Sequence, residues 1–366
     1  MADWLPERWS LPQLLLVALA LSVVLSGAVA ASTSQSAFGA YNAGWNGASE
    51  LRGLASDQGA EPTVALNTSE YETVDPTGTV AVILSPNEPY SERDRARVAD
   101  FVASGGTLVV AEDFRPHSTP ILERLGVETR FDGAPLRDEQ EYYRSPALPV
   151  AANVSDHPAT TGVDALTLNH GTSLQVNASA NNTTVLVSSS EFAYLDRDRD
   201  GELDDDEQLA SRPVAVRESV GNGTVYVVSD PSLFINAMLD RPGNDQFARN
   251  LLSAERALLD YSHKTGQPPL VRAVLVLRDS PLWQLSLGLF AVGAVVWSGR
   301  LRRRLAALSE RFSRDDAPSE ELALADADPE EVIAYLSREH PDWDETRLRR
   351  VMRGVIRGDK RTEHDD

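Results

Sequence analysis

The apolar residues of this chain are concentrated in two long runs near its ends. One covers residues 11–31 (LPQLLLVALALSVVLSGAVAA), and the other covers 282–297 (LWQLSLGLFAVGAVVW) and is followed by GRLRRRL. A helix needs about 20 mostly apolar residues to cross a bilayer, and basic residues mark the cytoplasmic side of a span. The pattern predicts a protein of the cell membrane with these parts: a cytoplasmic N-terminus (1–10), a transmembrane helix (11–31), an extracellular domain (32–280), a second transmembrane helix (281–299) and a cytoplasmic tail (300–366).

The first apolar run has a second interpretation as a signal peptide. Ala28-Val29-Ala30 resembles a small-residue cleavage site, and Arg8 could serve as the charged region before it. About 20 apolar residues is long for the core of a signal peptide. We favour an uncleaved anchor, and both interpretations place the following domain outside the cell.

Between the two runs, short apolar segments alternate with amphipathic segments. Continuous apolar strands separated by helices indicate βαβ units and a parallel sheet with both faces covered. The sequence therefore predicts a doubly wound, mostly parallel α/β sheet. Strands are expected at 63–66, 79–84, 107–111, 183–189, 214–218 and 224–229, and helices at 49–58, 91–104, 119–125, 230–238 and 244–261. Residues 130–182 are loop-rich, and no order of elements is predicted there.

Three local signals support these boundaries. Ser91 is a candidate N-cap for the helix that follows it. Gly126 is expected to end the helix over 119–125. Gly221-Asn222-Gly223 is a hairpin turn signal between the last two predicted strands.

The tail contains two further helix patterns. Asp328 caps the first, which has Pro329 in its first turn and continues to about residue 340. The second covers 344–357 and has one apolar face coated by arginines. Two helices of this size have too small a core for strong independent stability. They are expected to form a hairpin, to bind another membrane or cytoplasmic protein through residues 328–357, or to lie on the lipid bilayer.

The composition is strongly acidic and poor in lysine. The chain has 55 acidic and 34 basic residues, for a net charge of −21, and its only lysines are Lys264 and Lys360. An acidic, arginine-rich surface is typical of proteins exposed to very high salt, where charge repulsion is screened. We therefore interpret the acid excess as salt adaptation in a halophilic archaeon, and we expect no nucleic-acid partner. The absence of cysteine excludes disulfides and thiolate sites.

N-glycosylation is expected because N-x-S/T sequons are frequent in the predicted extracellular domain. The alternative is that a polar, threonine-rich surface creates such triplets by composition alone. The sequons begin at Asn67, Asn153, Asn177, Asn181, Asn182 and Asn222.

The most specific motif is DRDRDGELDDDE over residues 196–207, called the acidic loop below. A calcium loop has carboxylates at positions 1, 3 and 5, glycine at 6, a carbonyl at 7 and an acid at 12. Leu203 at position 8 would be the apolar anchor, and the arginines between the acids are expected to point outward. The flanking sequences favour strands, so the motif predicts a structural Ca²⁺ site without the paired helices of an EF-hand. An acidic surface loop is the alternative. The expected metal-site residues are Asp196, Asp198, Asp200, Glu202, Asp204 and Glu207.

Catalytic motifs are weak, and no catalytic residue is predicted. The chain has neither a G-x-S-x-G elbow nor an H-E-x-x-H pair. His117 follows a predicted strand end, where α/β sheets bind ligands, but a solvated loop histidine is the simpler interpretation. Asp230 and Ser232 follow another strand end, where helix capping is the favoured role.

Three stretches carry a resemblance to a known family: YNAGWNGASELR, VAVILSPNEPYSERDRARVADFVASGGTLVVAEDF, and GNGTVYVVSDPSLFINAML. They resemble a haloarchaeal membrane family, the domain of unknown function 4350 family. The resemblance implies a fold similar to class I glutamine amidotransferases and to the ectodomains of auxiliary gliding and ABC-transport proteins. The amidotransferase nucleophile is a cysteine, which this chain lacks, so the fold carries no enzymatic assignment.

The expected function is that of a non-catalytic, membrane-anchored protein. Its extracellular amidotransferase-like domain would act as a scaffold, a sensor or an auxiliary subunit of a membrane complex. A domain that binds a small ligand or a glycan is the alternative, and a hydrolase is a remote one.

Overall fold

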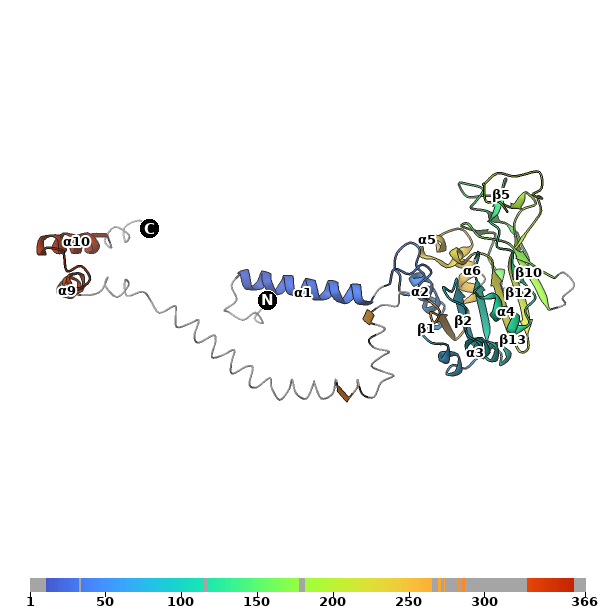
Figure 1. Ribbon diagram of the computed structural model, residues 1–366, viewed down its shortest axis with the longest axis horizontal. Helices are drawn as coiled ribbons and strands as arrows, with labels where there is room; N and C mark the ends of the chain where they lie inside the picture. The colour runs from blue at the N-terminus through green and yellow to red at the C-terminus, as the bar shows by residue number, and fades with distance from the viewer. Residues whose placement is uncertain are drawn as a thin grey trace. The chain divides into compact units, whose positions relative to one another are not determined.

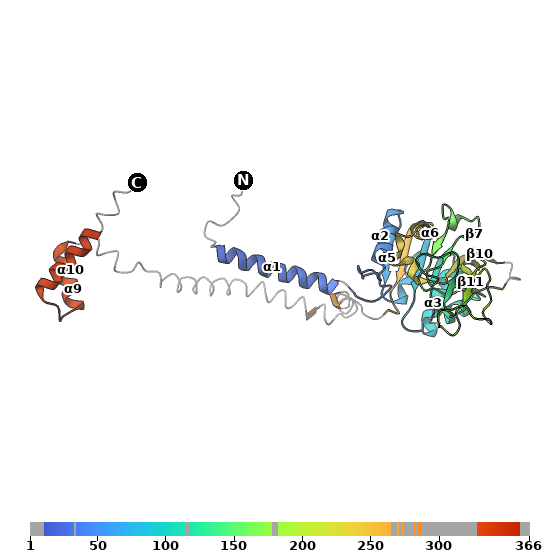
Figure 2. The same ribbon diagram turned by 90° about the horizontal axis from the view of Figure 1, so that it is seen from above.

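The computed structural model describes residues 11–32, 34–114, 117–177, 182–264 and 328–358, with 269–270, 273, 282 and 285–286. The chain divides into two compact units, Met1–Val276 and Leu277–Asp366, and each is considered by itself. The α/β domain belongs to the first unit, and the helices α9 and α10 belong to the second (Figure 1, Figure 2).

The centre of the α/β domain is a mixed sheet of eight strands in the order β1-β14-β2-β3-β13-β12-β10-β7 (Figure 1). The first five strands in this order are parallel, and β12, β10 and β7 each run antiparallel to the strand before. The parallel strands therefore end at one edge of the sheet, called the carboxyl edge below. The strands are β1 (Glu61–Ala65), β2 (Thr79–Leu84), β3 (Thr107–Ala111), β7 (Asn153–Val154), β10 (Thr183–Ser188), β12 (Pro213–Val220), β13 (Gly223–Val228) and β14 (Arg256–Asp260).

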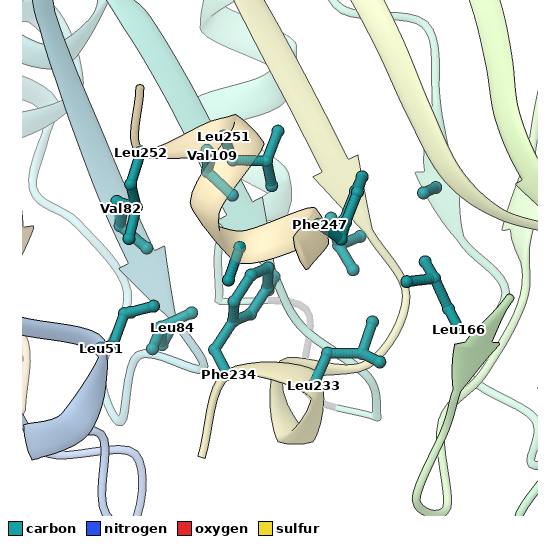
Figure 3. Close-up of a cluster of buried hydrophobic side chains, with 14 of the residues drawn as sticks. Leu51, Val82, Leu84, Val109, Leu166, Leu233, Phe234, Phe247, Leu251 and Leu252 are labelled. Atoms are coloured by element: carbon teal, nitrogen blue, oxygen red, sulfur yellow. The ribbon is translucent and has the colours of Figure 1, made fainter. Parts of the chain in front are cut away.

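Helices cover both faces of this sheet because its central strands are apolar on both sides. In β2, Val80, Val82 and Leu84 belong to one hydrophobic layer, and Ala81 and Ile83 belong to the other. The first layer includes side chains of α2, η3 and α6 (Figure 3), and the second includes side chains of α3 and α4. The helices are α2 (Ser49–Asp57), α3 (Glu92–Ala103), α4 (Thr119–Leu125), α5 (Asn236–Leu239) and α6 (Asn244–Leu251), with 3-10 helices η1 (Thr68–Glu72), η2 (Pro158–Thr160) and η3 (Pro231–Phe234).

Short strand pairs organise the region for which the sequence predicted no order. In the described residues they form β11 with β5, β4 with β9, and β6 with β8. Figure 1 shows β5, the partner of β11, above the main sheet. The bounds are β4 (Arg130–Phe131), β5 (Leu136–Asp138), β6 (Val150–Ala151), β8 (Leu166–Thr167), β9 (Leu174–Gln175) and β11 (Ala193–Leu195).

Several elements form where local signals predicted them. Strands β2 and β3 and helix α4 have the expected bounds. Ser91 is the N-cap of α3, and its side chain accepts a hydrogen bond from the backbone N–H of Asp94. Gly126 ends α4 with a φ of 71°, a left-handed conformation that glycine adopts without strain. Gly221 and Asn222 join β12 and β13 in an antiparallel hairpin.

The helix predicted over 244–261 is wrong in its second half. Helix α6 ends at Leu251, and Arg256–Asp260 forms β14, which pairs with both β1 and β2. A short apolar run fits a strand as well as a helix, so pairing with two neighbours decides its structure. The helix predicted over 230–238 is divided into η3 and α5, because Ile235 has an extended backbone (φ −84°, ψ 155°).

The prediction of two transmembrane helices is wrong. The first apolar run forms α1 (Leu11–Ser32), but among the described residues no helix combines the length and the apolarity that crossing a membrane requires. The prediction counted apolar residues along the sequence, whereas a span must carry them within one helix that is long and apolar enough. The expected span over 281–299 lies almost entirely outside the described residues. The placement of the domain outside a cell membrane and of the tail in the cytoplasm is withdrawn with it.

The two helices of the tail form as predicted. They are α9 (Pro329–Glu339) and α10 (Glu345–Gly358), which pack against each other. Asp328 is the N-cap residue of α9, and Pro329 occupies its first turn. Leu348 on α10 is buried.

Candidate functional site

The acidic loop connects β11 to β12, so its flanks are strands, as the sequence predicted. Asp196, the residue that directly follows β11, is 2% exposed, whereas Asp198 and Asp200 are exposed. The arginines between the acids both reach across to residues 114–133. Arg197 binds Asp132 at 3.2 Å, and the guanidinium of Arg199 lies 5.4 Å from the ring centre of Phe114.

The structure brings most of the predicted metal ligands together in two overlapping groups. Asp196, Asp198 and Glu207 each offer a carboxylate oxygen, and these three oxygens lie within 4.8 Å of one another. Asp198, Asp200 and Asp204 form the second group, with all three residues exposed. Glu202 belongs to neither group, so its side chain is not gathered with the others; the motif expected only its backbone carbonyl at this position.

Backbone turns within the loop hold these carboxylates in place. Glu207 Oε1 accepts a hydrogen bond from the backbone N–H of Arg197 at 2.7 Å, which joins the two ends of the loop. Asp200 Oδ1 accepts one from Glu202 N at 2.8 Å. Gly201 has a φ of 86°, which explains the glycine at this position of the motif.

Asp196 is the buried end of the carboxylate cluster. Its Oδ2 lies 3.5 Å from a guanidinium nitrogen of Arg137, whereas its Oδ1 has no hydrogen-bond partner. A buried carboxylate oxygen without a partner is uncommon, because burial removes the water that would otherwise solvate it.

A pocket of about 280 Å³ opens over the cluster. Asp198, Asp204 and Glu207 line it together with Arg197 and Arg212. The neighbouring carboxylates, Asp200 first, raise the pKa of the Asp204 carboxyl, so this part of the surface disfavours further negative charge.

One feature of the motif differs from the expectation. Leu203 is 41% exposed and therefore does not anchor the loop in the core. Asp196 and the arginines hold the loop instead, through Arg137 and Asp132.

The predicted glycosylation residues lie at the surface wherever the structure describes them. Asn67 also caps η1, because its side chain accepts a hydrogen bond from the backbone N–H of Ser69. Asn181 lies outside the described residues, and glycosylation of the sequons stays a prediction. The exposed sequon residues are Asn67, Asn153, Asn177, Asn182 and Asn222.

The second candidate region is the carboxyl edge, where parallel α/β sheets commonly bind ligands. Glu112 follows β3 and is fully buried. Its Oε1 accepts a hydrogen bond from the backbone N–H of His117 at 3.0 Å, and its Oε2 accepts bonds from the N–H and the hydroxyl of Ser118. Burial raises the pKa of Glu112 to about 6 despite these bonds.

Asp230 is the second residue after β13, at the same edge, and is also fully buried. Its Oδ1 accepts a hydrogen bond from Ser232 N at 2.7 Å, which caps η3 as the sequence predicted. Its Oδ2 accepts a bond from Asn169 N at 2.5 Å. Burial raises the pKa of Asp230 to about 7. Both carboxylates therefore hold loops at this edge through both of their oxygens.

Asp260 is a third carboxylate at this edge and lies at the end of β14. Its Oδ2 accepts hydrogen bonds from the hydroxyls of Tyr71 (2.8 Å) and Tyr90 (3.0 Å). Its Oδ1 accepts bonds from the N–H and the hydroxyl of Ser262. Sequence reasoning missed Asp260 because it placed the residue in a helix; the short apolar run before it, followed by Asp and Ser, was the signal that could have found it.

Residues 34–48, called the N-terminal segment below, pack against the carboxyl edge. Tyr41 contacts Tyr261 edge-on at 5.7 Å between ring centres, and Tyr261 follows β14. The hydroxyl of Ser34 lies 3.1 Å from that of Tyr261. Only about 10 Å³ of space remains between the segment and the ends of β2 and β14, which is room for about one water molecule.

The histidines do not gather into a ligand site in the described residues. His117 contacts Glu112 through its backbone N–H and not its ring. His263 stacks on Tyr90 at 3.6 Å between ring centres and lies 3.6 Å from Asp94. His157 caps η2, because its Nδ1 accepts a bond from Ala159 N. The ligand role weighed for His117 therefore has no support from its contacts.

These features define a mixed α/β domain with an acidic surface loop and a carboxyl edge filled by its own polar groups. A family model described as "Domain of unknown function (DUF4350)" matches residues 40–252, and the chain belongs to this family. Membership confirms the family predicted from the sequence and assigns no activity. A search of curated proteins finds no match.

Several solved structures are distantly similar. The "mmIFT52 N-terminal domain" has 15% identity and a TM-score of 0.38, covering 50% of this chain and 77% of that one. A thua-like protein from Bacteroides uniformis ATCC 8492 has 14% identity and a TM-score of 0.30, covering 51% and 71%. Cytoplasmic protein STM1381 from Salmonella typhimurium LT2 has 12% identity and a TM-score of 0.34, covering 57% and 88%. Likenesses of this size assign no function to this chain.

Proposed function

We propose that the chain is a non-catalytic scaffold protein that acts as an auxiliary subunit of a protein complex. The observation that carries the proposal is the state of Glu112 and Asp230, the buried acids at the carboxyl edge. In each, both carboxylate oxygens accept hydrogen bonds from the domain's own N–H groups.

A raised pKa alone would also fit a catalytic acid, so the hydrogen bonds must decide between the two roles. A general acid or base needs an oxygen within reach of a substrate. Glu112 and Asp230 are fully buried and direct their oxygens at the loops that begin α4 and η3. Their geometry favours a structural role.

The N-terminal segment supports the same conclusion. In the amidotransferase-like fold that the sequence resemblance implies, a ligand would sit at the carboxyl edge. Here Tyr41 and Ser34 occupy the space beside Tyr261, at the ends of β2 and β14. The domain covers this part of its own edge, as a scaffold would.

The tail supplies the proposed contact with another protein. Leu348 is buried between α9 and α10, while Ile333 and Leu336 on α9 stay half-buried. A hairpin of two short helices has little core of its own, and a partner would cover its remaining apolar side chains.

The structural role of Glu112 is tested by the variant Glu112→Gln. Glutamine keeps the shape but turns an NH₂ group toward one of the backbone N–H donors. If the acid is structural, we expect the free energy of unfolding to fall by about 1–3 kcal/mol, because a buried donor loses its acceptor. The measurement is urea denaturation of the full chain at fixed salt and about pH 4, below the pKa of about 6, so that loss of the buried charge does not itself change stability.

A catalytic acid behaves in the opposite way, because functional sites hold such groups at the expense of stability. Its replacement would leave stability unchanged or increase it under these conditions, and that outcome would contradict the proposal. Glu123→Gln on the exposed side of α4 is the matched control, with an expected change within about 0.5 kcal/mol.

A further inference from the structure

The acidic loop carries an inference that is independent of the scaffold assignment. Asp196 is 2% exposed, and its Oδ1 has no hydrogen-bond partner although Arg137 lies 3.5 Å from Oδ2. The residue lies within the carboxylate cluster that it forms with Asp198 and Glu207. Asp196 thus belongs to a cluster of acids and has a buried oxygen that Arg137 leaves without a partner, which indicates a place for a further cation.

The spacing of the cluster suits a single calcium ion. Calcium binds oxygens at about 2.3–2.6 Å, so two oxygens on opposite sides of one ion are separated by about 4.6–5.2 Å. The three oxygens of Asp196, Asp198 and Glu207 lie within 4.8 Å of one another, a spacing close to that of ligands on a single ion.

We propose that the acidic loop binds one Ca²⁺ ion through Asp196, Asp198 and Glu207, and that the ion is the partner of Asp196 Oδ1. Asp200 and Asp204, which share a group with Asp198, are exposed and supply further oxygens directly or through water. Because Asp196 and Glu207 are the first and last residues of the loop, the ion closes the connection between β11 and β12.

The chemistry of the ligands favours calcium over magnesium. All the gathered groups are carboxylates on an irregular loop, and calcium accepts six to eight oxygens in flexible geometry. Magnesium requires near-ideal octahedral geometry at about 2.0–2.1 Å and gives up its water reluctantly. We therefore expect calcium to bind more tightly than magnesium.

The test measures the melting temperature of the full chain as Ca²⁺ is added at constant, high ionic strength, and determines Kd by calorimetry. We expect a saturable increase in melting temperature with a Kd between about 10⁻⁷ and 10⁻³ M, the range of sensor and extracellular sites. Mg²⁺ at equal concentration should give a smaller increase.

Variants distinguish binding of Ca²⁺ by specific ligands from general attraction of Ca²⁺ to the negative charge of the loop. Asp198→Asn and Glu207→Gln each remove one ligand charge, and we expect each to weaken Ca²⁺ binding by about tenfold or more. Asp205→Asn is the matched control, since it removes the same charge from the same loop, but the residue belongs to neither carboxylate group. Its Kd should stay within about twofold of the parent.

Circular dichroism without calcium checks that each variant is folded; Asp198 is exposed, so its replacement should leave the fold intact. An equal effect of Asp198→Asn and Asp205→Asn would overturn the proposal in favour of charge screening. The absence of a saturable response in the parent protein would overturn it as well.

Discussion

The side-chain amide of Asn236 donates a hydrogen bond to the backbone carbonyl of Gly44 at 2.7 Å, across 192 positions of sequence. The same nitrogen lies 3.2 Å from the carbonyl oxygen of Asn42. On its other side, Oδ1 of Asn236 accepts a bond from the backbone N–H of Glu50 at 3.0 Å. One buried asparagine on α5 thus holds the N-terminal segment and the first turn of α2 against the carboxyl edge.

The variant Asn236→Asp replaces the hydrogen-bond donor of this side chain with an acceptor. A carboxylate oxygen would replace the amide and face two carbonyl oxygens, so we expect a loss of about 3 kcal/mol or more in the free energy of unfolding. Asn236→Ala removes the donor without adding charge and should cost about 1–3 kcal/mol. Urea denaturation measures both.

The exposed turn residue Asn222 provides the control for this change, because Asn222→Asp should alter stability by no more than about 0.5 kcal/mol. A loss of less than about 0.5 kcal/mol in Asn236→Ala would mean that the amide donors do not hold the segment.

The N-terminal segment also depends on a glycine where the backbone folds back on itself. A Cβ at Gly47 would lie 1.9 Å from the carbonyl oxygen of Asn42, whereas a Cβ at Gly53 in α2 would meet nothing within 4 Å. We expect Gly47→Ala to lower the free energy of unfolding by at least about 2 kcal/mol, since the backbone must move. Gly53→Ala should raise it by about 0.5–1 kcal/mol, because alanine favours a helix. Thermal denaturation of the two variants compares them directly, and equal effects would contradict this packing.

Asp230 should make stability depend on pH. Its pKa is raised to about 7 in the folded protein, whereas an aspartate in an unfolded chain titrates near about 3.9. Between about pH 4 and 7 the folded state therefore keeps a proton that the unfolded state has lost. The stabilising contribution is complete below about pH 4 and is lost as the pH rises through 7.

The variant Asp230→Asn isolates this contribution because asparagine does not titrate. The measured quantity is the stability of the parent relative to the variant, that is, the difference between their free energies of unfolding. This difference should fall by on the order of 4 kcal/mol between pH 4 and 8. Urea denaturation at a series of pH values, with constant salt, gives this difference. If this difference does not change over the pH range, the pKa of Asp230 is not raised in the folded protein.

Leu258 tests the position of β14 between β1 and β2 in the sheet. The side chain is fully buried in the layer that α3 and α4 cover. We expect Leu258→Ala to cost about 2–5 kcal/mol of unfolding free energy, because it opens a cavity beneath these helices. The same change at Leu209, which is 44% exposed, should cost less than about 1 kcal/mol. Equal costs would be inconsistent with β14 as an interior strand between β1 and β2.

Much of the local structure follows from short-range sequence signals. Ser91 begins a helix because its hydroxyl accepts a hydrogen bond from a free N–H group of the first turn. Gly126 ends a helix because it adopts a left-handed conformation. Both effects act within one turn of the chain. The acidic loop was recognisable for the same reason, since its glycine and alternating acids lie within twelve positions. The sequence did not reveal three other features of this loop, because they depend on β5, a strand distant in sequence. These are the burial of Asp196, the exposure of Leu203 and the role of Arg137.

The sequence by itself determined the family, most elements of the α/β domain and the two helices of the tail. The tertiary structure decided that Arg256–Asp260 is a strand, because only pairing with β1 and β2 satisfies its backbone groups. It also made Asp230 and Asp260 buried acceptors for groups remote in sequence, the N–H of Asn169 for Asp230 and the tyrosine hydroxyls for Asp260. The physical reason is the same in each case. Patterns along a chain report interactions within a turn or a strand, whereas burial and long-range hydrogen bonds exist only once the layers have packed.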